Sequence, residues 1–221
     1  MNTVTKQRKG GILCLLALFG VATFTAFMHF APSGNLKLEQ GSRITLIGGN
    51  LGSRMINYDH FETELQLRNP SAGLVLRNMC DGGDTPGFRP TPNRNNPWAF
   101  PGAEKFQTEY ATNSHSEGHM ETPDEWLTRL KTDVVVAFFG FSESFHGQAG
   151  LPAFKGELDA FIKHTLYQPY NGKAAPQLAL VTPVAFEDLS SKMDVPDGKK
   201  ENANIALYVA AMKEVAARNK V

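Results

Sequence analysis

Three short polar stretches of the sequence carry side chains of the types used in acyl-transfer chemistry. Asn50 follows a glycine pair, and its amide can donate hydrogen bonds to an oxyanion but cannot attack an acyl carbon. Further along the chain, Cys80 offers a thiol, and Ser142 offers a hydroxyl next to the carboxyl group of Glu143. Acyl transfer needs a nucleophile, a base that deprotonates it and donors that face the oxyanion. These four residues are therefore the first candidates for a catalytic site.

A cysteine becomes a nucleophile only in an electropositive neighbourhood with a base beside it, and a lone cysteine is more often a small buried apolar residue. We therefore interpret Cys80 as structural, with a nucleophilic role as the alternative. His146 lies just after Ser144 and could reach the same site as a base. The helices expected at His60 and His164 suggest a surface or core residue for the first and a solvated or capping group for the second.

The sequence predicts no metal site. His115 and His119 have the spacing of two ligands on one helix face, but Gly118 between them argues against a helix. Asp81 and Asp84 flank two glycines and could ligate calcium, although such acids more often form Asx turns. We therefore expect no metal and no other cofactor.

Residues 79–123 are rich in Gly, Pro and Asn and contain several aromatic side chains. Connections of this length are usually functional loops or disorder, and the aromatic residues argue against disorder. Trp98 could stack on a sugar ring while polar neighbours bind its hydroxyls, namely Arg89, Asn93, Arg94 and Asn95. Alternatively, the aromatic residues hold a long loop against the domain. Both interpretations stay open at this point.

The elements that must position these residues alternate between strand and helix. Continuous apolar runs predict strands at residues 43–47, 74–76, 133–139 and 178–181. Apolar periodicity predicts helices at residues 53–68, 151–167 and 201–218, and Thr122-Pro123 is a typical start of another. Such alternation predicts an α/β fold, with a parallel sheet between helices and the strongly apolar third strand at its centre.

In such a sheet the site lies beyond the carboxyl ends of the strands. The loops after the four predicted strands should therefore converge at one edge of the sheet. These loops are residues 48–53, 78–85, 140–144 and 183–188. Every catalytic candidate named above falls in one of them or, like His146, directly after one.

A nucleotide site fits these residues poorly. A dinucleotide fingerprint needs Gly-x-Gly-x-x-Gly, whereas the first loop has glycines at 48, 49 and 52. This spacing is closer to the turn of short-chain dehydrogenases, but no Tyr-x-x-x-Lys pair accompanies it, since Tyr170 is followed by Lys173 and Tyr208 by Lys213. A phosphate-binding loop with Gly-Lys-Ser/Thr is absent from the sequence.

Taken together, the blocks after the strands resemble the SGNH (GDSL) hydrolase superfamily over about residues 41–221. They are Gly48-Gly49-Asn50-Leu51, residues 78–85, and Gly140-Phe141-Ser142-Glu143. The sequence "FFGFSESF" in particular resembles the SGNH modules of large multidomain proteins of Bacteroidetes and Planctomycetes type. The resemblance implies a flavodoxin-like three-layer α/β sandwich and an ester hydrolase activity.

Carried over by position, the resemblance places Asn50 where the family has its nucleophilic serine. It places Cys80 at the oxyanion glycine and Ser142 at the oxyanion asparagine, with Glu143 after it. The family's terminal Asp-x-x-His block, which supplies the base, does not occur in the sequence. The residues expected to bind the ligand are Gly49, Leu51, Asp84, Arg89, Trp98 and His146.

We therefore predict an ester hydrolase-like domain that acts on a small-molecule ester or an acylated glycan, with the usual serine replaced by asparagine. The alternative is a catalytically inactive module that binds a glycan or a protein. A doubly wound domain would normally supply another strand after the last predicted helix, so we expect the sheet to be truncated before its last strand.

The N-terminal region predicts export. Lys6, Arg8 and Lys9 precede an uncharged apolar run over residues 11–31, as in a signal peptide or membrane anchor. We divide the chain into this segment (1–32), a linker (33–40) and the hydrolase-like domain (41–221), which is expected to be periplasmic or extracellular. The 22 basic and 22 acidic side chains balance, so no nucleic acid partner is expected, whereas residues 1–32 would contact a membrane if uncleaved.

Overall fold

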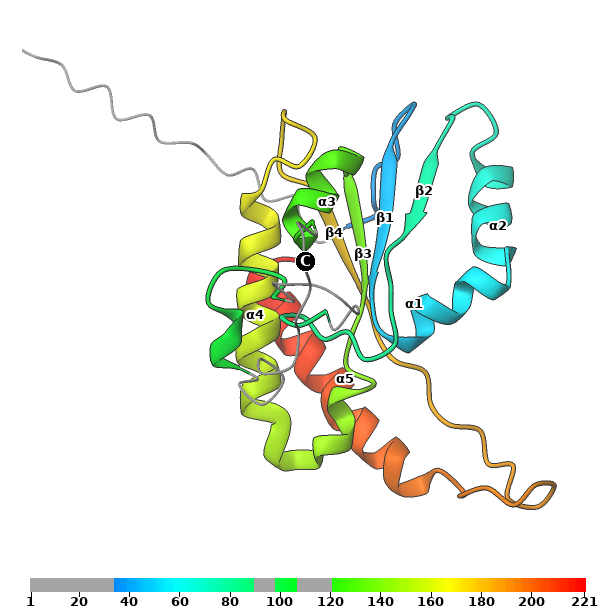
Figure 1. The fold of residues 1–221 in the computed structure, drawn as a ribbon. Coiled ribbons are helices and arrows are strands. Elements are labelled where there is room, and N and C mark those ends of the chain that lie inside the picture. Colours follow the sequence, from blue (N-terminus) through cyan, green and yellow to red (C-terminus); the bar gives the residue numbers. More distant parts are fainter. Residues whose placement is uncertain (1–33, 90–97, 107–120) are drawn as a thin grey trace, which may run out of the picture.

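The computed structural model describes residues 34–89, 98–106 and 121–221. Four parallel strands form one sheet in the order β2-β1-β3-β4 (Figure 1). The strands are β1 (Arg43–Gly48), β2 (Val75–Asn78), β3 (Val134–Phe138) and β4 (Gln177–Val181). The parallel sheet is confirmed, and so is the interior position of the third strand, which pairs with β1 and β4.

Helices cover both faces of the sheet (Figure 1). One face carries α1 (Asn50–Arg54) and α2 (His60–Arg68), and the other carries α3 (Pro123–Leu130), α4 (Leu151–Tyr167) and α5 (Lys199–Asn219). This arrangement is a flavodoxin-like three-layer α/β sandwich, as predicted. The described part of the chain contains no helix that combines the length and the apolar character needed to cross a membrane.

Alternation along β3 builds a core on each face of the sheet. Val135 and Ala137 pack with α4 and α5 in the larger core, whereas Val134, Val136 and Phe138 pack on the face of α1. All five residues of β3 are buried, because the strand is covered from both sides. The apolar run that predicted a buried strand is explained by this two-sided packing.

The start of α3 illustrates how local sequence determines an element. Thr122 caps α3: its hydroxyl accepts from the Glu125 amide at 3.2 Å, while the Glu125 carboxylate accepts from the Thr122 amide at 2.8 Å. This reciprocal pair satisfies two amides that the first helical turn leaves open. The predicted start at Thr122-Pro123 is confirmed, and α4 has the predicted bounds.

The single helix predicted for residues 53–68 is wrong. The chain forms α1, a 3-10 turn (Met55–Asn57) and α2, because Tyr58 is extended between them. Tyr58 and Phe61, expected on a buried stripe, are 65% and 39% exposed, and α2 buries none of its residues. From this segment, the sheet face is covered instead by Leu51, Met55 and Leu65.

Candidate functional site

Two glycines bring the first loop close to the third. Gly48 has φ +109°, and a Cβ there would lie 2.3 Å from the Phe138 carbonyl oxygen, so only glycine fits. The Gly49 amide donates to the same oxygen at 2.8 Å. The resemblance implied that the Gly49 amide is free to donate to an oxyanion. That amide is instead used to join β1 to β3.

The carboxyl ends of β1 and β3 are also the point where the strand order reverses. Chain connections leave β1 for β2 on one side and reach β3 on the other, which is where ligands bind in doubly wound sheets. Asn50 begins α1 here and is exposed. A Cβ on Gly49 would lie 3.9 Å from the Ser142 Oγ and 3.2 Å from the Asp84 carbonyl oxygen. The first three loops therefore meet, as predicted.

The second loop approaches Asn50 through Gly82 rather than Cys80. A Cβ on Gly82 would lie 3.1 Å from the Asn50 Oδ1, whereas the Cys80 Sγ packs under Gly52, 2.3 Å from a Cβ built there. The Cys80 amide donates to the Asn78 Oδ1 at 2.9 Å. The structure therefore places Gly82 beside Asn50, whereas the resemblance placed Cys80 at the oxyanion glycine.

Burial raises the pKa of the Cys80 thiol to about 12, with Asp84 adding to the rise and Arg89 opposing it. A thiol with such a pKa holds almost no thiolate at neutral pH, and the thiolate is the nucleophilic form. This pKa and packing favour the structural interpretation of Cys80.

The third loop turns into an irregular 3-10 segment, η4 (Glu143–Gly150). The Ser144 hydroxyl donates to the Phe141 carbonyl oxygen at 2.7 Å and closes this turn. Ser142, in contrast, makes no hydrogen bond to the described residues through its hydroxyl and is half-buried. Of the two serines, Ser142 is the one available to a ligand.

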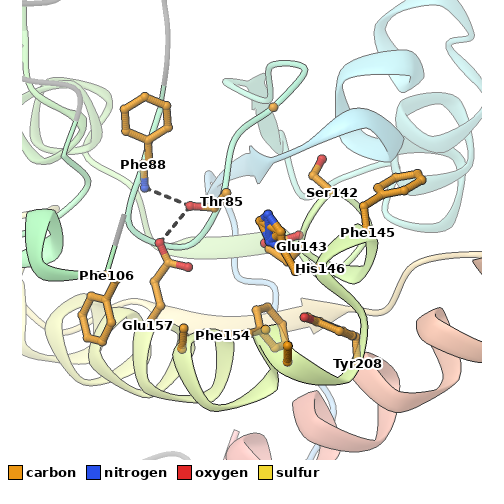
Figure 2. Close-up of a pocket in the computed structure, with 14 residues that line it drawn as sticks. Thr85, Phe88, Phe106, Ser142, Glu143, Phe145, His146, Phe154, Glu157 and Tyr208 are labelled. Carbon is orange, nitrogen blue, oxygen red and sulfur yellow. Dashed lines mark hydrogen bonds between the residues drawn. The ribbon is translucent and has the colours of Figure 1, made fainter. Parts of the chain in front are cut away.

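A cavity of about 750 Å³ lies beside this loop, between the second loop, η4, α4 and α5 (Figure 2). Ser142, Glu143 and His146 line it, together with the unpredicted residues Thr85 and Glu157. Asn50 is not among the lining residues and lies at the adjacent strand end. The structure thus brings Ser142, Glu143 and His146 together and leaves Asn50 at their side.

Glu143 is 7% exposed, and its Oε2 accepts from the Gly140 amide at 2.9 Å. Its Oε1 is buried without a hydrogen-bond partner in the described part of the chain. Burial, with a smaller contribution from the carboxyl groups of Glu157 and Asp84, raises the pKa of Glu143 to about 8, against hydrogen bonds from backbone amides. Glu143 is therefore mostly protonated at neutral pH in the free protein.

Glu157 projects from α4 and is 3% exposed. Its Oε1 accepts from the Thr85 hydroxyl at 2.9 Å and from the Gly87 amide at 3.1 Å, which ties the second loop to α4 (Figure 2). A Cβ on Gly87 would come within 2.8 Å of that oxygen, so glycine is required for the contact.

His146 is exposed and is held by a tight contact between η4 and α5. The Tyr208 hydroxyl donates to the Gly147 carbonyl oxygen at 3.0 Å, and Gly147 has φ +58°. A Cβ on Gly150 would lie 2.4 Å from that hydroxyl and 2.6 Å from the His146 Cβ. The two glycines therefore allow η4 to present His146 at the cavity.

The comparisons with known proteins concern the fold. No protein-family model matches the chain, and no curated protein matches it. Among solved structures, a gut microbial diltiazem-metabolizing enzyme matches 84% of this chain with a TM-score of 0.56 and 14% identity. This chain covers 36% of that enzyme's length, so the likeness shows a shared fold over one part of a larger protein.

Two esterases show weaker likeness. An acetyl xylan esterase has a TM-score of 0.48 at 16% identity, and the psychrotrophic esterase EstA from Pseudoalteromonas sp. has 0.44 at 13%. Each match covers 80% of this chain and 73% of the other.

The remaining predicted ligand-binding residues are mostly inside the domain. Leu51 is partly buried and packs against the core on the face of α1, and Asp84 and Arg89 are each 2% exposed. Trp98 pairs with Phe88 through a β-bridge and ring centroids 5.3 Å apart. Because Phe88 lines the cavity, this loop is held against the domain here, as the second interpretation proposed. Asn93, Arg94 and Asn95 lie outside the described residues.

The histidines in the described part of the chain lie in different surroundings. His164 is not a solvated group, because its Nε2 lies 2.7 Å from the Asp124 Oδ2 in a half-buried pair. His60 is exposed at the start of α2. His115 and His119 lie outside the described residues, among which no group of three or more His, Cys, Asp or Glu side chains could hold a metal ion.

Proposed function

We propose that this chain is an SGNH-type ester hydrolase domain that binds a small acylated molecule or an acylated glycan in the cavity. The observation that carries the proposal is the meeting of Ser142, Glu143 and His146 on one cavity wall, at the point where the strand order reverses. A hydroxyl donor, a carboxyl group and an imidazole there supply the kinds of group that ester hydrolysis uses.

The nucleophile in this proposal is water, because Asn50 cannot attack and Cys80 is held as a thiol. His146 removes the proton of a water molecule whose oxygen bonds to the acyl carbon. The Ser142 hydroxyl and the Asn50 amide, at adjacent strand ends, donate to the oxyanion. The intermediate then breaks its bond to the leaving alcohol, which takes the proton from His146.

Hydrolysis of nitrophenyl acetate and of acetylated xylo-oligosaccharides by the full chain tests the proposal. We expect Ser142→Ala to lower kcat by about 100-fold and His146→Gln by about 100-fold or more, because each loses a group used in the transition state. His60→Gln, at an exposed histidine on α2, is the matched control and should leave the rate unchanged. Equal rates in all four proteins would contradict the assignment.

A second candidate, a binding module without turnover, is favoured by the asparagine at the nucleophile position. In the described residues neither the Cys80 thiol nor the hydroxyls of Ser142 and Ser144 are hydrogen-bonded to a base, whereas the Thr85 hydroxyl donates to the carboxylate of Glu157. Calorimetric binding of the same oligosaccharides without release of acetate would support this candidate.

We also propose that residues 1–32 direct the domain out of the cytoplasm. The support is the basic cluster followed by an uncharged apolar run. These residues lie outside those described.

A further inference from the structure

Aromatic rings form much of the cavity wall. Among the described residues five rings line it, and they come from the second loop, the 98–106 segment, η4, α4 and α5. They belong to Phe88, Phe106, Phe145, Phe154 and Tyr208. Ligand cavities are typically lined by apolar and aromatic side chains, with a few polar groups that orient the ligand. This lining is therefore typical of a site for an apolar group.

Four of the lining rings are packed against a second ring, with centroids between 4.9 and 6.4 Å apart. The pairs are Phe88 with Trp98, Phe106 with Phe100, Phe145 with Phe141, and Phe154 with Tyr208. Such pairs are more stable than their buried area alone implies. Gly156 on α4 lets Phe106 lie against the helix, because a Cβ there would lie 3.1 Å from the Phe106 Cε1. The walls are therefore formed before a ligand binds.

Small side chains keep the space between the rings open. Ala149, Gly150 and Ala153 line the cavity on η4 and at the start of α4. The volume of about 750 Å³ lies in the range of cavities that hold drug-sized ligands. An acetyl group alone would leave most of this space to water. The cavity therefore has room for a second, larger group of an ester.

The polar groups of the lining are distributed unevenly. Ser142 and His146 come from one short stretch of chain, and Figure 2 shows Phe106 on the opposite side of the cavity from Ser142. The hydroxyl groups of Thr85 and Tyr208 already donate hydrogen bonds to other groups of the protein. A ligand in the cavity therefore meets the groups proposed for hydrolysis on one side and aromatic rings on the other.

We propose that the cavity binds an aryl group, a benzene ring or two fused rings, among the lining phenylalanine rings. Resting on the proposed hydrolase function, this identifies the substrate as an ester that carries an aryl group, with its acyl carbon beside Ser142 and His146. A flat aromatic ring gains offset and edge contacts with the wall rings, in addition to the burial of its apolar area.

Other groups of similar size use these walls less well. An unsubstituted sugar would place its hydroxyls against phenylalanine rings, at the cost of burying polar groups without partners. A saturated ring would bury a similar apolar area but would form no ring-to-ring contacts. Comparing an aryl ligand with its saturated counterpart therefore isolates the contribution of the aromatic walls.

Binding to the full chain, measured by calorimetry, tests the proposal with a matched pair of ketones. The pair is 5-phenylpentan-2-one and 5-cyclohexylpentan-2-one, which differ only in the aromaticity of the ring and have no ester bond to hydrolyse. We expect the phenyl ketone to bind about threefold more tightly, although it is the less apolar of the two, because only it gains ring-to-ring contacts. Equal affinities, or tighter binding of the cyclohexyl ketone, would overturn the proposal.

Two variants test whether the ligand lies in this cavity. Ala153→Leu would fill part of the space beside α4 and should lower the affinity for the phenyl ketone about tenfold. Phe145→Ala removes a lining ring that is 60% exposed, so it spares the core, and should lower that affinity about threefold.

Ala210→Leu, at another exposed alanine on a long helix, is the matched control and should leave the affinity unchanged. Circular dichroism confirms that each variant is folded, and Phe145→Ala alone suffices if Ala153→Leu unfolds. An unchanged affinity for the phenyl ketone in the folded cavity variants would overturn the proposal.

Hydrolysis of two esters of primary alcohols separates this inference from the proposed function. If 2-phenylethyl acetate and ethyl acetate are hydrolysed with equal kcat/KM, the aryl site is wrong and the hydrolase assignment stands. If the phenyl ketone binds in a way that depends on Ala153 while neither ester is hydrolysed, the aryl site stands and the hydrolase assignment is wrong.

Discussion

At the scale of single residues, Glu143 makes folding sensitive to pH. Its folded pKa of about 8 lies above the ordinary value of 4.5, so the folded state holds a proton that the unfolded state has lost. Stability is then greatest below about pH 4.5 as far as this group is concerned, and it falls as the pH rises toward 8. One pKa unit is about 1.4 kcal/mol, so the loss is up to about 5 kcal/mol.

Urea unfolding of wild type and Glu143→Gln between pH 5 and 9 measures this effect. The Gln side chain keeps an acceptor for the Gly140 amide but cannot ionise, so its stability should change less over that range. Parallel pH profiles for the two proteins would show that Glu143 does not hold its proton in the fold.

Cys80 should react slowly with a thiol reagent at pH 8 in the folded protein and rapidly in urea. The reason is a thiol pKa of about 12, caused mainly by burial under Gly52. A Cys14→Ser background removes the other cysteine. Rapid labelling of the folded protein would indicate a reactive thiol at the strand ends after all.

Sequence patterns identified the site residues on the loops but not Glu157, which lies on α4. Ser142, Glu143 and His146 follow a strand, and the rule on strand ends identifies them. Glu157 was missed, although an acid between Phe154 and Phe161 on a buried helix face is a detectable signal. Asp84 and Arg89 were expected to bind a ligand, but both are buried. Their burial arises from tertiary packing, which the composition of a loop does not indicate.

At the scale of elements, Gly48 determines how closely the end of β1 approaches the end of β3, and therefore how close the loops after them lie. Gly48→Ala should destabilise the fold by about 3 kcal/mol or more, since the methyl group would overlap the Phe138 backbone at a positive φ. Gly172→Ala is the matched control, with φ +75° and open space around it, and should cost about 1 kcal/mol. Similar melting temperatures for the two variants would contradict this account.

Elements with strong end signals were predictable, and those set by the sheet alone were not. Helix α3 has a capping box, and α4 begins at Leu151-Pro152, so the local sequence marks the start of each helix. The break between α1 and α2 has no proline or glycine to mark it. Helix α2 buries none of its residues fully and contributes only the partly buried Leu65 to the core, so a periodic pattern gives little indication of its bounds.

At the scale of the whole molecule, the proposed export signal in residues 1–32 can be tested. Alkaline phosphatase fused after residue 221 should be active in bacterial cells, because the enzyme folds only outside the cytoplasm. Removal of residues 1–32 should abolish that activity. Activity that persists in the shortened fusion would contradict export by this segment.

The hydrogen bond from Tyr208 to Gly147 also has a consequence for the order of biosynthesis. The four described strands have all been made once β4 is synthesised, but the cavity still lacks α5, which supplies Tyr208 and holds η4 in place. A growing chain would therefore carry these strands with the part of α4 that packs on α5 open to water. The cavity could close only when α5 emerges, so chaperones would have access until then to the functional side of the domain.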